Sequence, residues 1–200
     1  MKTIGITGGI ASGKSMVTDY LVEQGANLID ADYVSRQLVA PGQAALHEIS
    51  RLFGEEYLDQ EGNLRRKALA HLIFSDAQQR QKLDQLMHPL IHEAIQAQLV
   101  EYQQAGQQLV ILVAPLLYEA GLSQLVDEVW LIAVHPDTQL RRLMNRDELT
   151  LTEANKRLAA QSSLAEKLDK ADVIINNNGD IKTTLAQIKA LWRVANEEKK

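Results

Sequence analysis

A glycine-rich stretch near the start of the chain reads Gly8-Gly9-Ile10-Ala11-Ser12-Gly13-Lys14-Ser15, and it follows directly on the apolar run of residues 3–7. It has the spacing G-x-x-x-x-G-K-[ST] of a phosphate-binding loop, or P-loop. The apolar run predicts a buried strand, and residues 15–22 predict a helix whose N-terminus faces the bound anion. We expect Lys14 to reach the β- and γ-phosphates of a nucleoside triphosphate and Ser15 to face Mg²⁺. The alternative is a strand-to-helix turn that carries an accidental Lys-Ser pair.

Composition places the chain among ordinary globular proteins, because 46% of its 200 residues are hydrophobic and 24% are charged. One core with inserted lobes fits this length, so we expect a single folding unit with appendages. The lack of cysteine excludes disulfides and thiolate metal sites. The net charge of −5 argues against general nucleic-acid binding, and the longest apolar run, residues 109–117, is too short to cross a bilayer. With no secretory apolar segment before the glycines, we expect a cytoplasmic enzyme with neither a nucleic-acid nor a membrane partner.

Five strand signals alternate with helical patterns along the chain, and this alternation predicts an α/β fold. The signals cover residues 4–7, 27–30, 108–114, 128–134 and 173–176. The continuous apolar run at residues 109–113 is typical of a strand that is covered on both faces. The sequence therefore predicts an open, mostly parallel five-stranded sheet of the P-loop NTPase type with helices on both faces. Ligands of such sheets bind outside the carboxyl ends of the strands.

Two stretches are longer than simple crossovers require. The stretch between the second and third strands is almost wholly helical in pattern, so we expect an inserted helical substrate lobe at residues 35–104. A second insertion, residues 136–169, is expected to form a small helical lid, in which Thr150-Leu151-Thr152-Glu153 has the residues of a helix start. The nucleotide-binding core is then predicted to comprise residues 1–34, 105–135 and 170–200.

Two carboxylates follow the second strand in the sequence Asp30-Ala31-Asp32. In a doubly wound sheet this position lies beside the mouth of the P-loop. Asp32 could there accept a proton from an attacking hydroxyl or hold a metal-bound water. The alternative is that either carboxylate merely caps the helix that starts near Tyr33.

Arg142 and Arg146 are four residues apart, so they share one face of the helix expected after Pro136-Asp137. Guanidinium groups placed there can close over a triphosphate and neutralise charge that spreads onto the γ-phosphoryl oxygens. A solvated basic helix face is the alternative reading.

Two further patterns allow more than one interpretation. Asn176-Asn177-Asn178-Gly179 follows the fifth strand and could hydrogen-bond an adenine ring or form a plain turn. His88 and His92 have the spacing of a zinc-binding helix, but the glutamate of H-E-x-x-H is missing. We therefore favour a role for one histidine in lining a pocket.

The third strand ends in Ala114-Pro115 without an aspartate, so the carboxylate that usually helps to hold Mg²⁺ is missing from its expected place. Ser15, the phosphates and water would then hold the metal, with Asp32 as a further candidate. The sequence lacks the N-K-x-D element of guanine-nucleotide switches. The D-x-x-G match at residues 59–62 follows no apolar strand, and we predict a turn there.

Taken in order, these motifs resemble the dephospho-CoA kinase family, P-loop enzymes that complete coenzyme A biosynthesis. The matching residues are Thr7-Gly8-Gly9-Ile10 with Ser12-Gly13-Lys14-Ser15, Asp30-Ala31-Asp32 with Arg36, Arg66, His88-Pro89, Pro115-Leu116-Leu117-Tyr118-Glu119, Arg142, Arg146-Asp147, Ala160-Gln161, and Asn177 with Gly179. The P-loop alone would indicate a large superfamily, whereas the ordered set is much more specific. The chain departs from the family at Ala114, where members often carry an aspartate.

The resemblance implies transfer of the γ-phosphoryl group of ATP, with Mg²⁺, to the 3′-hydroxyl of the ribose of dephospho-CoA, giving CoA and ADP. It implies catalytic roles for Asp32, Lys14 and Arg142, with Asp32 as the base or hydroxyl-orienting group and Ser15 at the metal. It also implies two sets of binding residues. ATP would be bound by residues 8–15, Arg142, Arg146, Asn177 and Gly179, and dephospho-CoA by Thr7, Asp32, Arg36, Arg66, His88, Pro115, Leu116 and Leu117.

Two rival functions share part of the pattern. A kinase of the nucleoside-monophosphate type would have the same core, lobe and lid and would differ in its acceptor. A nucleotide-sensing protein would bind ATP without turning it over, and the paired carboxylates after the second strand argue against it. The sequence carries no indication of the oligomeric state.

Overall fold

The computed structural model describes residues 1–197, which fall into two compact units. Unit 1 comprises residues 1–29 and the described chain from residue 99 onward, and unit 2 comprises residues 30–98. Unit 2 overlaps the predicted lobe at 35–104, although the bounds of the predicted sub-regions stay a prediction. Residues 198–200, which the sequence analysis assigns to the core, lie outside the described residues.

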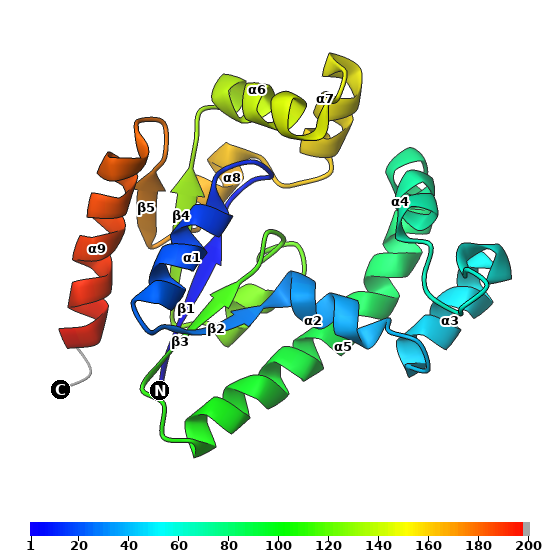
Figure 1. Cartoon of the computed structure of the whole chain (residues 1–200), viewed down its shortest axis with the longest axis horizontal. Coiled ribbons are helices and arrows are strands. Elements are labelled where there is room, and N and C mark those ends of the chain that lie inside the picture. The colour runs from blue at the N-terminus through cyan, green and yellow to red at the C-terminus, as the bar shows by residue number, and fades with distance from the viewer. Residues whose placement is uncertain (198–200) are drawn as a thin grey trace. The chain divides into compact units, whose positions relative to one another are not determined.

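A five-stranded sheet in the order β2-β3-β1-β4-β5 forms the centre of unit 1 (Figure 1). Strand β1 pairs in parallel with both β3 and β4, and β4 pairs in parallel with β5. The strands are β1 (Lys2–Thr7), β2 (Asn27–Asp30), β3 (Leu109–Val113), β4 (Glu128–Ala133) and β5 (Val173–Asn176). The predicted open α/β sheet and its five strands are confirmed, because each predicted apolar run became a strand.

Helices α1 and α9 cover one face of the sheet (Figure 1), where Val17 of α1 and Ile188 of α9 pack with Ile4 and Ile6 of β1. Side chains alternate between the two faces of a strand. Gly5 therefore faces the opposite side, where a Cβ on this residue would meet the side chains of Val126 and Leu117 at 3.1–3.2 Å. The helices of unit 1 are α1 (Lys14–Glu23), η2 (Leu122–Leu125), α6 (Pro136–Asp147), α7 (Leu151–Ala159), α8 (Leu164–Leu168) and α9 (Ile181–Glu197).

Unit 2 is helical and has its own apolar core, to which Val39, Leu46, Ile49, Leu69 and Met87 contribute. Its elements are α2 (Ala31–Leu38), α3 (Ala44–Phe53), η1 (Glu55–Tyr57), α4 (Arg66–Ser75) and α5 (Ala77–Gln104), of which the last residues belong to unit 1. Pro89 lies inside α5 without ending it.

Local hydrogen bonds confirm the predicted turn at residues 59–62 and the predicted helix start at residues 150–153. The carboxylate of Asp59 accepts hydrogen bonds from the backbone N–H groups of Glu61 and Asn63, which makes residues 59–62 the predicted turn. Thr150 and Glu153 form a reciprocal capping box at the start of α7. In the described part of the chain, no helix combines the length and the apolar character that crossing a membrane requires.

Candidate active site

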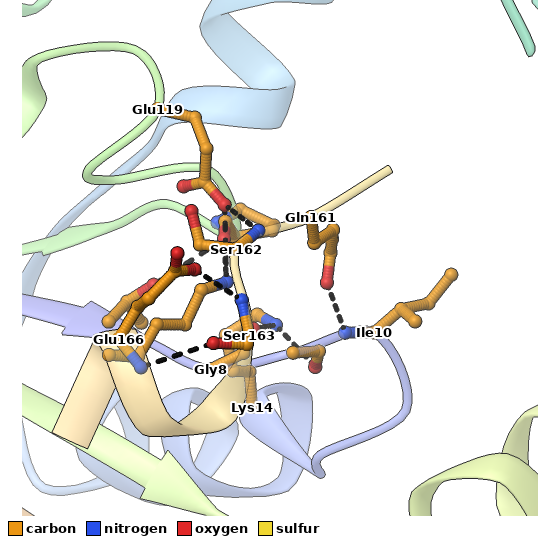
Figure 2. A network of polar contacts seen from close by, with 12 residues as sticks. Gly8, Ile10, Lys14, Glu119, Gln161, Ser162, Ser163 and Glu166 are labelled. Atoms are coloured by element: carbon orange, nitrogen blue, oxygen red, sulfur yellow. Dashed lines mark hydrogen bonds and ion pairs between the residues drawn. The ribbon is translucent and has the colours of Figure 1, made fainter. Parts of the chain in front are cut away.

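The glycine-rich loop connects β1 to α1 at the carboxyl end of the sheet, as the sequence predicts. The Lys14 ammonium group folds back over the loop and donates hydrogen bonds to the carbonyl oxygens of Gly8 and Gly9, the latter at 3.1 Å (Figure 2). Ser15 lies exposed in the first turn of α1. A helix N-terminus and a loop with inward N–H groups form a site of positive potential, which suits a phosphate chain.

Two positions of this loop require glycine, because neighbouring atoms lie too close to leave room for a Cβ atom. A Cβ on Gly8 would lie 2.7 Å from the carbonyl oxygen of Ile132, and a Cβ on Gly13 would lie 2.2 Å from Nδ2 of Asn177. Gly13 also has a φ of 95°, in the left-handed region that L side chains rarely adopt. Ala11, which carries a side chain, also lies in the left-handed region, with a φ of 59°. Such residues persist where the surrounding structure fixes them, often at functional sites.

The outer side of the loop is held by side chains from the region that the sequence analysis predicts to form a lid. The backbone N–H of Ile10 donates to Oε1 of Gln161 at 2.9 Å (Figure 2), and the Ile10 carbonyl accepts from Nε2 of Gln139 at 2.8 Å. Gln139 belongs to α6, and Gln161 lies between α7 and α8. Together with Ser12, they line a cavity of about 230 Å³. The buried Ser12 hydroxyl has no hydrogen-bond partner.

Asn177, which directly follows β5, contacts the P-loop at Ser12, two residues beyond the contacts of the glutamines with Ile10. Its side-chain amide donates to the carbonyl of Ser12 at 2.7 Å, and its Oδ1 accepts from the Thr184 hydroxyl at 2.9 Å. Both Asn177 and Thr184 are buried, whereas Gly179 is exposed. The contact of Asn177 and Gly179 with adenine stays a prediction, while the contact of Asn177 with the P-loop is a feature of the structure.

A buried ion pair lies beside the P-loop. Nζ of Lys167, whose side chain is 2% exposed, lies 3.4 Å from Oε1 of Glu119, which also accepts a hydrogen bond from the Ser162 N–H at 2.8 Å (Figure 2). Burial acts to raise the pKa of Glu119, but the Ser162 hydrogen bonds and the Lys167 charge are among the effects that bring it below its ordinary value. Glu119 is therefore a carboxylate at neutral pH.

Arg142 and Arg146 lie on α6, as predicted. Arg146 is bound through two nitrogens to the Asp147 carboxylate, at 2.8 and 3.1 Å, and Asp147 also pairs with Arg157 of α7 at 2.6 Å. The hydrogen bond from Arg146 is the main cause that lowers the pKa of Asp147. Asp147 therefore fixes α6 to α7 and orients one of the two predicted lid arginines.

Unit 2 contains four of the eight residues predicted to bind the acceptor. Asp30 caps α2 by accepting hydrogen bonds from the N–H groups of Asp32, at 2.8 Å, and Tyr33, at 3.1 Å. Asp32 and Arg36 are exposed on α2, and Arg66 donates to the carbonyl of Arg36 at 3.3 Å. The capping alternative is thus confirmed for Asp30, and Asp32 is an exposed residue in the first turn of the same helix.

An apolar cavity of about 160 Å³ lies within unit 2, and Arg66 is one of its lining residues. Its lining includes Val39, Leu69 and Met87. His88 lies on α5, with Nε2 3.7 Å from Asp84. The predicted role of His88 in a binding pocket stays a prediction.

The remaining predicted acceptor residues belong to unit 1. The hydroxyl of Thr7, a fully buried residue, lies 3.4 Å from the carbonyl of Pro115, its hydrogen-bond acceptor. Leu117 is also fully buried, whereas Leu116 is 38% exposed. The structure thus joins the end of β1 to the turn after β3, with Leu116 as the exposed side chain of that turn.

Comparisons with known proteins agree with this geometry. A family model described as dephospho-CoA kinase matches residues 2–183. The chain belongs to the dephospho-CoA kinase family. The dephospho-CoA kinase of Shouchella clausii is 48% identical over 97% of this chain and 99% of the relative. A solved dephospho-CoA kinase from Campylobacter jejuni, 27% identical, matches 99% of this chain and 100% of its own with a TM-score of 0.74. A shikimate kinase from Bacteroides thetaiotaomicron, 14% identical, matches 96% of this chain and 97% of its own with a TM-score of 0.52 and shares the fold alone.

Membership of the dephospho-CoA kinase family makes the protein an ATP-dependent kinase. Sequence reasoning did not assign site roles to Gln139, Gln161, Glu119 or Lys167 in this family member. Gln161 and Glu119 lie within motifs that match the family, so a signal for them existed. Lys167 resembles an ordinary surface lysine, because burial of a lysine is rare and depends on a partner elsewhere in the chain.

Proposed function

We propose that the protein transfers the γ-phosphoryl group of ATP to the 3′-hydroxyl of the ribose of dephospho-CoA and releases CoA and ADP. The observation that carries this proposal is the family match over residues 2–183, which includes the P-loop and the lid arginines. We also propose a cytoplasmic location, because the phosphoryl donor ATP is supplied there.

On the donor side, the P-loop N–H groups and the Lys14 ammonium bind the phosphates. Ser15 fits a role as a Mg²⁺ ligand, because its exposed hydroxyl offers the oxygen that this ion prefers. Among residues 1–197, no three His, Cys, Asp or Glu side chains gather to hold a metal. In kinases Mg²⁺ is usually held mainly by phosphates and water. When bound, Mg²⁺ neutralises charge on the phosphate oxygens.

The lid arginines act on the transferred group. Arg142 and Arg146 neutralise charge on the phosphoryl oxygens as ADP leaves. Asp147 binds the guanidinium of Arg146 through two nitrogens and so limits its orientations before ATP arrives. Asn177 and Gly179 remain our candidates for contact with adenine.

On the acceptor side, Asp32 accepts the proton of the ribose hydroxyl, or orients that hydroxyl for attack. Arg36 and Arg66 supply positive charge for the phosphates of dephospho-CoA. The apolar cavity of unit 2, next to Arg66, suits a less polar part of the same molecule. His88, Thr7 and the turn Pro115-Leu116-Leu117 remain our candidates for further contacts with dephospho-CoA.

The test compares two aspartates that are two residues apart. Asp32→Asn should lower the rate of phosphoryl transfer by about 10²-fold or more, the range for loss of a positioned base, and leave the Kd for ATP nearly unchanged. Asp30→Asn is the matched control, because asparagine retains the oxygen that caps α2. Mass spectrometry of dephospho-CoA incubated with ATP, Mg²⁺ and each protein measures the new 3′-phosphate.

Each result has one reading. Full transfer by the Asp32→Asn protein would remove Asp32 from the mechanism. If the wild-type protein adds no phosphate to dephospho-CoA but does so to a nucleoside monophosphate, the proposed acceptor is wrong.

A further inference from the structure

A loop that turns its N–H groups toward an anion turns its carbonyl groups away from it, and those carbonyls need donors of their own when they are buried. In this protein the donors are side chains. Gln139 donates to the carbonyl of Ile10, and Asn177 donates to the carbonyl of Ser12. Two carbonyls of the P-loop are therefore held by side chains from other elements.

Asn177 is the most firmly fixed of these donors. It is 4% exposed, its backbone N–H donates to the carbonyl of Ala133 at 2.8 Å, and its Oδ1 accepts from the buried Thr184. Its Nδ2 then reaches Ser12 at 2.7 Å in a buried hydrogen bond. The main chain, the oxygen and the nitrogen of this one residue each have a partner, so the amide has little freedom to turn.

We propose that Asn177 is a positioning residue for the phosphate-binding loop, which it acts on through the carbonyl of Ser12. By holding that carbonyl outward, it directs the N–H of Gly13, which belongs to the same planar trans peptide group, toward the phosphates. The proposal rests on the proposed use of this loop to bind the triphosphate. It differs from the adenine contact predicted for Asn177, because it concerns the phosphates and not the base.

The two roles can be separated with inorganic tripolyphosphate, which has phosphates but no base. In the Asn177→Ala protein, the affinities for ATP and for tripolyphosphate should fall by the same factor, about tenfold, as expected for a lost buried hydrogen bond. The KM for dephospho-CoA should change by less than about twofold. Asn178→Ala is the matched control, because this neighbour is exposed and its side-chain oxygen binds the N–H of His135.

Titration calorimetry on the full-length proteins at low temperature, with melting curves for each, gives the answer. Loss of ATP affinity with unchanged tripolyphosphate affinity would overturn the proposal in favour of the adenine contact. A lower melting temperature with both affinities unchanged would overturn it in favour of a purely structural role. A wild-type protein that does not bind tripolyphosphate would instead contradict the proposed function of the loop, and the inference would fall with it.

If Asn177→Ala does not fold, Thr184→Val provides the second measurement. This change keeps the shape of the side chain and removes only the hydroxyl that fixes Oδ1 of Asn177. Equal losses of about twofold or more for both ligands support the proposal, and no loss for either one contradicts it. Thr184→Ser, which restores a hydroxyl, should return both affinities toward the wild-type values.

Discussion

Replacing Lys167 with methionine should destabilise unit 1, because the change leaves the Glu119 carboxylate without its counter-charge. Nζ of Lys167 lies 3.4 Å from Oε1 of Glu119, and the lysine side chain is 2% exposed. The other oxygen, Oε2, is buried without a hydrogen-bond partner. Methionine fills a similar volume, so the substitution removes the charge without opening a large cavity.

The expected loss is about 3 kcal/mol. Removal of one partner of a buried ion pair costs about 3–5 kcal/mol, because a charge is left in a poorly solvated place. Glu119 retains 21% side-chain exposure and the hydrogen bond from Ser162, so the lower end of that range applies. For a chain of this size, such a loss corresponds to a fall in melting temperature of about 6–12 °C.

Urea unfolding followed by tryptophan fluorescence measures this loss. The chain has two tryptophans, Trp130 and Trp192, and both belong to unit 1, so the signal reports on that unit. The double variant Lys167→Met, Glu119→Gln is the control, because the neutral amide still accepts the Ser162 hydrogen bond. It should recover most of the lost stability.

The loss should also depend on pH. In the wild-type protein the pKa of Glu119 lies below its ordinary value of 4.5, so its contribution to stability is present above that value and is lost as the pH falls through the lower folded pKa. Without the Lys167 charge, one of the effects that lower the pKa of Glu119 is lost, while burial still raises it. The carboxyl group of Glu119 therefore protonates at a higher pH. The stability difference between the two proteins should therefore shrink as the pH approaches 4. A Lys167→Met protein within about 1 kcal/mol of the wild type at pH 7 would refute the reasoning.

Two further predictions concern the P-loop and the lid. Lys14→Ala should weaken ATP binding and reduce turnover by at least about tenfold each, since the ammonium charge on the phosphates is lost; a variant that retains both, measured by calorimetry and a coupled ADP assay, would discredit the P-loop assignment. Asp147→Asn should cost about 1 kcal/mol at neutral pH, because Arg146 and Arg157 lose their shared partner. The lowered pKa of Asp147 means that its contribution is present above the ordinary value of 3.8 and is lost as the pH falls through the folded pKa. Unfolding curves of the two proteins should therefore converge at low pH, and a constant difference at all pH values would show that charge is not the cause.

The strands were predictable because the relevant signal is local. Each strand buries an apolar run, and the run itself marks the element. The order of the strands in the sheet was not predictable, because pairing between residues far apart leaves no mark in either segment. That β3 lies between β1 and β2 is a property of the whole fold.

The predicted site shows the same division. The glycine spacing marks the N–H side of the P-loop, since every loop that binds phosphate in this way needs it. The carbonyl side needs only a donor within reach, and that donor can come from any neighbouring element. Gln139 of α6 takes this role for the carbonyl of Ile10, whereas Gln161, before α8, accepts from the Ile10 N–H. No fixed spacing from the glycines connects either glutamine to the loop.

Asn177 was only partly predictable, because the apolar run Val173-Ile174-Ile175 does not show by itself which face of β5 is buried. Residues at i and i+2 of a strand share a face. Ile175 of β5 is completely buried, and continuation of the alternation by one step past the strand places Asn177 on the same side, with Asn176 and Asn178 exposed. A buried amide must find hydrogen-bond partners inside the protein. The strand period therefore distinguishes one asparagine of the three as a structural donor, which composition alone could not do.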